Sequence, residues 1–384
     1  MTFITLALIV AAGLCGPLLA ARESWRIPVV IGELFAGVLI GKTTFNWVDP
    51  EDVTLSFLAD TGFGLTMLVI GSQIPVRQHE VRRALGRGAL GAVLVGIVGA
   101  GLGTLIAAVF DTGPAALDAV LLSSSSAALV LPILQSLRIS ASGSAQLIAQ
   151  IAIADAACIV ALPLIVEPDR ALLAALGAVA IAASAALVAL LVRAATRRGW
   201  ARRLHRASHK REFALEMRIS VLFLFLLAAI AQATNVSVML AGFTLGLVLA
   251  AIGEPHRLAR QLFGITEGFF APLFFVWLGA SIDLDALGAH PEMILLGVAL
   301  ATGAVVSHLV ARAAGLPWLQ AVASAGQLGV PIAAVTLGIE TDSLAPGEDA
   351  GILLGALLTV ALCAVAAGRV RSQPRDRSAG RVET

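Results

Sequence analysis

Long apolar segments alternate with short polar ones along almost the whole chain. Each apolar segment has roughly the 15 to 25 residues that a helix needs to cross the hydrocarbon core of a bilayer. This pattern predicts an all-α polytopic membrane protein with about 13 transmembrane helices. The predicted spans are residues 3–21, 28–41, 53–74, 86–110, 115–137, 144–166, 171–193, 213–232, 235–252, 260–282, 292–313, 318–339 and 350–368.

The composition agrees with this interpretation. Of the 384 residues, 58% are hydrophobic and 13% are charged, and the mean hydropathy is +0.92. A water-soluble domain of this length could not cover its surface with so few charged side chains. The three cysteines, Cys15, Cys158 and Cys363, have no paired spacing, so the sequence supports neither a disulfide framework nor a cysteine-ligated metal site.

Basic residues fall on alternate polar segments. The largest basic cluster runs from Arg193 to Arg218, whereas only Lys42 and Arg170 lie on segments of the opposite side. Because cytoplasmic loops carry an excess of lysine and arginine, we expect an external N-terminus and a cytoplasmic C-terminus in the cell (inner) membrane. The basic loop at 197–211 is then a topology determinant that contacts membrane lipids rather than nucleic acid.

The two ends of the chain are interpreted as follows. The first 21 residues lack the basic start of a secretory signal, so they are expected to form an uncleaved first span. Residues 1–370 are expected to form one transmembrane domain, and residues 371–384 a short disordered cytoplasmic tail.

Three pairs of segments recur in the same order about 200 residues apart. The matched spans lie an odd number of spans apart, so the second copy enters the membrane from the opposite side. Such inverted repeats are typical of secondary transporters, whose sites lie where interrupted helices meet near the midplane. The pairs are Ala36-Gly37-x-x-x-Gly41 with Ala241-Gly242-x-x-x-Gly246, residues 65–76 with 273–284, and the segments that end at Pro132 and Pro331.

The fifth and twelfth spans are expected to be interrupted and to cross each other. In the fifth span, four consecutive serines favour an unwound segment in which Ser124, Ser125 and Ser126 offer oxygens to a cation. They could instead be small packing residues that let helices approach closely. In the twelfth span the supporting residues are expected to serve the broken backbone or to contact the ion. The residues that break the two spans are Ser123 to Ser126 and Pro132, and Ser324, Gly326, Gln327 and Pro331.

Asp155 is the acid expected to lie nearest the bilayer midplane, with about 11 apolar or uncharged residues on either side. A carboxylate at that depth is costly unless it binds something, so it marks a candidate proton and cation site. A protonated structural acid is the alternative. Asp155 is the only expected metal ligand of the acid type, and the metal is a transported monovalent cation.

Three further titratable residues inside predicted spans are candidate accessory groups. Asp60 and Glu267 are nearer the membrane faces than Asp155, so a vestibule or a helix-pairing role is expected for both. His308 is the only ionisable group well inside span eleven, where it is either a packing residue or an accessory titratable group. Glu33 is expected near the membrane interface.

Five motifs occur in an order that resembles the sodium/proton exchanger domain of the monovalent cation:proton antiporter-2 family, which includes Kef-type members. The resemblance covers essentially residues 3 to 368. It implies a panel-and-core fold, usually in a homodimer, in which a six-helix core exchanges Na⁺ or K⁺ for H⁺ with Asp155 as the membrane acid. The motifs are IPVVIGELFAGVLIG, LADTGFGLTMLVIGSQI, SSSSAALVLPILQSL, an acid-bearing span ending in ALPLIV, and GFFAPLFFVWLGASIDL.

The chain departs from the family pattern at three places. Members generally carry a polar or acidic residue just before the membrane acid, and this chain has Ala154. Electrogenic members often have a lysine on the helix that corresponds to span eleven, where this chain has Ser307 and His308. Kef-type systems usually append a cytosolic nucleotide-binding domain after the last span, and this sequence has none after its last predicted span. Ligand gating of that kind is therefore not expected.

These features predict a secondary active transporter that exchanges Na⁺ or K⁺ for H⁺ and is electroneutral through one membrane acid. The alternative is a cation channel or a non-transporting sensor on the same fold. An enzyme is not expected. The acid lacks the G-x-G flanks of intramembrane aspartyl proteases, and Ser123 to Ser126 lack the flanking glycines of serine types. No cofactor and no nucleic-acid partner are expected.

Overall fold

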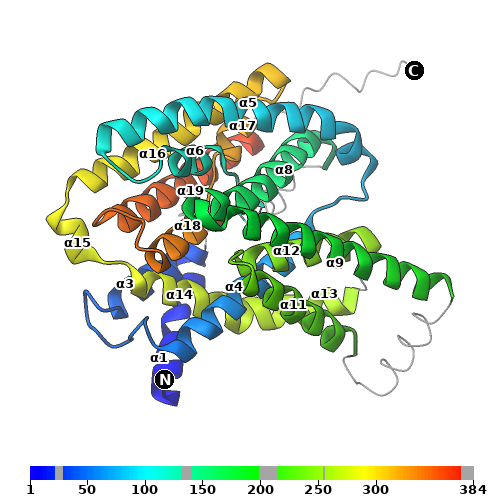
Figure 1. Cartoon of the computed structure of the whole chain (residues 1–384), viewed down its shortest axis with the longest axis horizontal. Helices are drawn as coiled ribbons and strands as arrows, with labels where there is room; N and C mark the ends of the chain where they lie inside the picture. The colour runs from blue at the N-terminus through cyan, green and yellow to red at the C-terminus, as the bar shows by residue number, and fades with distance from the viewer. Residues whose placement is uncertain (22–28, 128, 131–140, 199–214, 254–255, 373–384) are drawn as a thin grey trace, which may run out of the picture.

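The computed structural model describes residues 1–21, 29–127, 129, 130, 141–198, 215–253 and 256–372, and all regular structure in this part is helical (Figure 1). The helices are α1 (Phe3–Gly13), α2 (Cys15–Ala20), α3 (Val29–Ile40), α4 (Val53–Gln73), α5 (His79–Phe110), α6 (Ala115–Ser123), α8 (Ala141–Val166), α9 (Ala171–Arg197), α11 (Leu215–Ala233), α12 (Val238–Ile252), α13 (His256–Ile265), α14 (Ala271–Ser281), α15 (Leu284–Ala289), α16 (Glu292–Leu309), α17 (Trp318–Ser324), α18 (Gly329–Glu340) and α19 (Glu348–Ser372).

The predicted all-α membrane architecture is confirmed. Nine helical segments of the described residues are long and apolar enough to cross a membrane, and α3 and α12 are shorter apolar helices. All of them coincide with predicted spans, while α6 begins the fifth predicted span and α19 covers the last. Most of the expected cytoplasmic tail, residues 373–384, lies outside the described residues.

The helices form two groups (Figure 1). The core group, in the upper half of the view, contains α5, α6, α8, α16, α17, α18 and α19. The panel group, in the lower half, contains α1, α3, α4, α11, α12, α13 and α14. Within the core group α5 packs against α6 and α8, and α16 packs against α19. These helices belong to predicted spans four to six and eleven to thirteen, which are the spans that the family resemblance implies for the core.

The inverted repeat is visible in how the panel helices pair. Spans two and three of the first copy are α3 and α4, and their counterparts in the second copy are α12 and the span that ends in α14. In the structure α3 packs on α14 and α4 packs on α12, so each helix pairs with the counterpart of its neighbour. This crosswise pairing of helices is what a twofold symmetry relation between the two copies of the repeat requires.

Glycines make these crossings close. A Cβ atom on Gly279 would lie 2.1 Å from the carbonyl oxygen of Leu34, and one on Gly246 would lie 2.4 Å from that of Leu68. Small residues at such positions let membrane helices approach at the backbone. The glycines of the repeated motifs are therefore packing residues at the two panel crossings.

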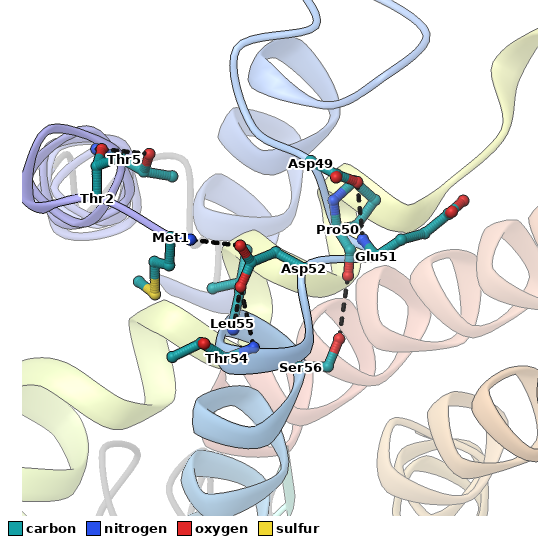
Figure 2. A network of polar contacts seen from close by, with 10 residues as sticks. All are labelled: Met1, Thr2, Thr5, Asp49, Pro50, Glu51, Asp52, Thr54, Leu55 and Ser56. Atoms are coloured by element: carbon teal, nitrogen blue, oxygen red, sulfur yellow. Dashed lines mark hydrogen bonds and ion pairs between the residues drawn. The ribbon is translucent and has the colours of Figure 1, made fainter.

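The external end of the panel, in the expected orientation, is held by polar contacts around the start of α4 (Figure 2). Asp52 caps α4 by accepting hydrogen bonds from the backbone N–H groups of Thr54 and Leu55, at 2.9 and 3.1 Å. Its carboxylate also contacts the amino group of Met1. The hydrogen bond from that amino group, together with the backbone bonds, lowers the pKa of Asp52. The carbonyl of Pro50 accepts a hydrogen bond from the Ser56 hydroxyl at 3.1 Å.

Both predicted helix breaks are present. In span five, α6 ends at Ser123, residues 124–126 are not helical, and helical geometry resumes at residue 127. In span twelve, α17 ends at Ser324 and α18 begins at Gly329. Pro132 lies outside the described residues, whereas Pro331 lies in the first turn of α18, where a missing N–H costs no helical hydrogen bond.

Candidate functional site

The two interrupted spans meet at their breaks, which confirms the predicted crossing. The backbone N–H of Ser126 donates a hydrogen bond to the carbonyl oxygen of Gly326 at 2.9 Å. The serines of the first break are buried, with exposed fractions of 1% for Ser124, 1% for Ser125 and 2% for Ser126. The site is therefore a pair of non-helical backbone segments held together inside the core group.

Serine hydroxyls donate hydrogen bonds to carbonyl groups in the last turns of the two helices that end at the breaks. Ser124 Oγ donates to the carbonyl of Leu121 at 3.0 Å, and Ser324 Oγ donates to that of Ala321 at 2.8 Å. The two serines occupy matching places at the C-terminal ends of α6 and α17. A helix end exposes several carbonyls that need such partners, so both serines stabilise the breaks.

Asp155 reaches the first break from α8. Its side chain is buried, and Oδ2 accepts a hydrogen bond from the backbone N–H of Ala127 at 3.3 Å. Ala127 is the residue at which helical geometry resumes. The carboxylate thus lies at the point where helical geometry resumes after the first break, bonded to a backbone N–H group that favours an anion. No ion pair of Asp155 is found among the described residues.

The second break has the equivalent contact with a different side chain. The backbone N–H of Gln327 donates to Thr359 Oγ1 on α19 at 3.1 Å, and Thr359 in turn donates to the carbonyl of Ala356 at 2.7 Å. The expected role of the Gln327 side chain in bonding the broken backbone is not seen, since its Nε2 has no hydrogen-bond partner in the described part of the chain. Sequence reasoning missed Thr359, a lone hydroxyl in the middle of an otherwise apolar span.

His308 lies at the same crossing. It extends from α16, is fully buried, and its Nε2 is 3.0 Å from Ser125 Oγ. Its Nδ1 is 2.8 Å from the carbonyl oxygen of Ala304 on the same helix. The neighbouring Ser307 is also fully buried, and its hydroxyl has no partner among the described residues.

A second buried amide, which the sequence did not single out, lies on the same helix as Asp155. Gln150 is fully buried, and neither its Oε1 nor its Nε2 has a hydrogen-bond partner in the part of the chain that the structure describes. Its amide lies against Gly91 of α5, where a Cβ atom would come within 2.3 Å of Oε1. The glycine provides the space that this side chain occupies.

Asp60 lines a cavity between the two helix groups and is not at the crossing. The cavity has a volume of about 230 Å³ and is bounded by α4 and α14 on the panel side and by α18 and α19 on the core side. Glu51 and Asp349 contribute two more carboxyl groups to its lining, and Lys42 contributes one cation. The cavity extends along α18 between Ile339 and Val335.

The two other acids considered from the sequence, Glu267 and Glu33, belong to the panel group. Glu267 lies in a short π-helical segment, Thr266–Phe270, between α13 and α14, and is exposed. Glu33, which was expected near the membrane interface, is only 3% exposed within the protein. The reason is the close packing of α2 on α3, in which the Glu33 side chain covers Gly16. Neither acid is among the residues that meet at the crossing.

The side chains at the crossing suit a hard monovalent cation better than a transition metal. Within the described residues there is no group of three or more histidine, cysteine, aspartate or glutamate side chains that could hold a metal ion. The crossing instead offers one carboxylate, serine hydroxyls and the carbonyls of two broken helices. Oxygen ligands of this kind, including backbone carbonyls, replace the hydration shell of alkali cations in selective membrane proteins.

Comparisons with known proteins identify the family of the chain. The transmembrane model of the sodium/hydrogen exchanger family matches residues 5–370. The chain is 23% identical over 380 residues to the putative Na⁺/H⁺ antiporter YjbQ of Bacillus subtilis, covering 92% of this chain and 61% of that one. It is 29% identical over 301 residues to the glutathione-regulated potassium-efflux protein KefC of Klebsiella pneumoniae, covering 76% and 47%.

The fold also matches a solved structure, that of the sodium proton antiporter MjNhaP1 from Methanocaldococcus jannaschii. The TM-score is 0.66 with 17% sequence identity, and the match covers 97% of this chain and 98% of the other. At that identity the likeness concerns the fold. The chain spans about half to three fifths of the length of the curated relatives named above.

Proposed function

This chain belongs to the sodium/hydrogen exchanger family, and we propose that it exchanges a monovalent cation, Na⁺ or K⁺, for H⁺ across the cell membrane. The single observation that carries this proposal is the position of Asp155, a buried carboxyl group bonded to the backbone N–H group at which helical geometry resumes after the first break. The names of the relatives agree with it, since one is described as a putative Na⁺/H⁺ antiporter and another as a potassium-efflux protein.

Asp155 carries both ions in this proposal because its burial makes an empty, charged state costly. An aspartate at the centre of a membrane helix costs about 3 kcal/mol on insertion scales. The backbone hydrogen bond from Ala127, at 3.3 Å, is long for a bond to a charged acceptor. A proton or a cation removes the remaining charge, and the two compete because a protonated carboxyl group cannot hold the cation.

The other ligands are the oxygens of the two breaks. Ser124, Ser125 and Ser126 supply hydroxyl groups, and the non-helical backbone supplies carbonyl oxygens. Ser324, Gly326 and Gln327 support the second break. The half-helix ends place partial positive and negative charges around the site, which offset part of the cost of holding a bare carboxylate or a bound cation.

We infer one-for-one, electroneutral exchange from the charges available at the crossing. Ala154 precedes Asp155 and adds no second acid, and α16 provides the neutral pair Ser307 and His308 where a lysine would add a charge. Each cycle then carries one positive charge in each direction. In the same proposal, the core group moves against the panel group during transport. The panel group forms the dimer contact of a homodimer. The cavity lined by Asp60 is a vestibule on the route to the site.

Exchange in proteoliposomes tests this proposal. The full chain is reconstituted with a pH-sensitive dye inside, and Na⁺, K⁺ or Li⁺ is added outside with choline as the control. Proton efflux that depends on one of these cations is expected. It should be lost in Asp155→Asn and kept in Glu267→Gln, a matched removal of a carboxylate from a membrane helix outside the crossing. Undiminished exchange in Asp155→Asn would contradict the site assignment.

A further inference from the structure

His308 joins span eleven to the first helix break through two hydrogen bonds that use both ring nitrogens. Nδ1 is 2.8 Å from the carbonyl oxygen of Ala304, one turn earlier on α16, and Nε2 is 3.0 Å from Ser125 Oγ. The ring is fully buried, and Ser125 is 1% exposed. Ser125 lies two residues before Ala127, whose N–H group is bonded to Asp155.

These two contacts fix the tautomer of the ring. A carbonyl oxygen has no hydrogen to give, so Nδ1 must carry the proton that bonds Ala304. No carboxylate is bonded to His308 in the described part of the chain, and a fully buried, unpaired imidazolium would be costly. The neutral ring then has its lone pair on Nε2, which accepts the hydrogen of the Ser125 hydroxyl.

This arrangement decides what the Ser125 oxygen can bind. With its hydrogen directed to His308, the hydroxyl presents only lone pairs to the non-helical segment beside Asp155. We propose that His308 is a positioning residue, which holds Ser125 as an oxygen donor to the transported cation without itself touching that cation. The inference rests on the proposed function, because it assigns a role to one ligand of the same site.

A purely structural role, in which His308 only ties α16 to the break, makes a different prediction. Two substitutions separate the roles. Glutamine places an amide oxygen near the position of Nε2 and can still accept from Ser125, whereas asparagine places its amide near Nδ1 and can bond only Ala304. His308→Asn should therefore lose the orientation of Ser125, and His308→Gln should retain it.

The measurement is cation-dependent proton exchange in proteoliposomes, analysed as apparent KM and maximal rate. His308→Asn is expected to raise the apparent KM for the cation about three- to tenfold, the size of one hydrogen-bonded contact, with less change in the maximal rate. His308→Gln should stay within about twofold of the wild type. Ser307→Ala, which removes a neighbouring buried hydroxyl that has no described partner, is the matched control and should leave the KM unchanged.

Coupling to Ser125 is the sharper test. Ser125→Ala should raise the KM by a similar factor, and adding His308→Asn to Ser125→Ala should change it little further, because the oxygen that the histidine orients is already gone. Independent, multiplying effects of the two substitutions would overturn the inference. So would equal KM values for the asparagine and glutamine variants in a protein that still exchanges.

The ring itself gives a readout that does not depend on transport by variants. The chain has six histidines, and ¹⁵N-histidine spectra of the wild type and His308→Gln identify the signal of His308 by difference. A neutral ring with the proton on Nδ1 at pH 7 is expected, and a proton on Nε2 would overturn the inference. If the wild type exchanges none of the cations, the proposed function fails and the ligand role fails with it. Equal KM values in an exchanging protein refute the role of His308 alone.

Discussion

Cation binding at Asp155 should stabilise the folded protein against heat, and protons should oppose that effect. A ligand that binds only the folded state adds RT ln(1 + [L]/Kd) to its stability, which is about 2.7 kcal/mol at a hundredfold excess over Kd. The structure gives a reason to expect such a gain, since within the described part of the chain the buried carboxylate has a single hydrogen bond, at 3.3 Å. A cation would replace the solvation that this group lacks.

The sign of the pH dependence follows from competition for one carboxylate. As the pH rises, a larger fraction of Asp155 is free of its proton, so the stabilisation by a fixed cation concentration increases. As the pH falls through the range in which Asp155 takes up its proton, apparent affinity drops by up to tenfold per pH unit. That loss is about 1.4 kcal/mol of cation-dependent stability per unit when the cation is in excess.

The assay is thermal unfolding of the detergent-solubilised protein, followed by tryptophan fluorescence during titration with NaCl, KCl or LiCl against choline chloride at constant ionic strength. Asp155→Asn keeps an oxygen that can accept from Ala127 and keeps the shape of the side chain, but it has no charge to exchange. Its unfolding temperature should not respond to the cation, whereas that of Glu267→Gln should respond as the wild type does. An equal cation response in Asp155→Asn would refute the reasoning.

Three further predictions concern charge balance, packing and orientation. The rate and end point of exchange in proteoliposomes should not follow an imposed membrane potential, because one positive charge moves in each direction; a rate that follows the potential would refute one-for-one exchange. Gly279→Ala, whose Cβ would lie 2.1 Å from the Leu34 carbonyl oxygen, should destabilise the protein by about 1–3 kcal/mol. Gly96→Ala, with nothing within 4 Å, should leave the unfolding temperature unchanged or raise it slightly. A cysteine placed in the 197–211 loop should resist labelling by an impermeant maleimide in intact cells, and rapid labelling would contradict a cytoplasmic position.

The parts of the fold that depend on one-dimensional patterns could be predicted from the sequence. Apolar run length fixes where helices cross a membrane, and the spacing of matched motifs revealed the inverted repeat. The breaks were readable because Ser123 to Ser126 and the Gly326 segment interrupt apolar runs that would otherwise continue. The contact of Asp155 with Ala127 is a feature of the structure, whereas the role of Asp155 in ion transport remains a prediction.

Contacts that depend on helix rotation could not be predicted. Hydropathy indicates that a residue lies in a span, but it does not indicate which neighbouring helix the side chain faces. The hydrogen bond between Ser125 and His308, which are 183 residues apart, therefore could not be predicted from the sequence beyond the fact that both side chains are polar. The same limit explains why Gln150 was missed and why the burial of Glu33 within the protein was not predicted. Glu33 follows the start of a short span, and its side chain lies against Gly16, where α2 packs on α3.

The inverted repeat also bears on the proposal of a single transported charge. In each copy, a backbone N–H group of the interrupted span is bound by a side chain from the next span: at the end of the break in the first copy and within the break in the second. Asp155 binds Ala127 in the first copy, and Thr359 binds Gln327 in the second. The threonine hydroxyl donates to the Ala356 carbonyl and takes up neither a proton nor a net charge. Twofold architecture alone would permit two ion-binding acids, and a neutral hydroxyl at the second break supports the proposal that Asp155 alone alternates between proton and cation.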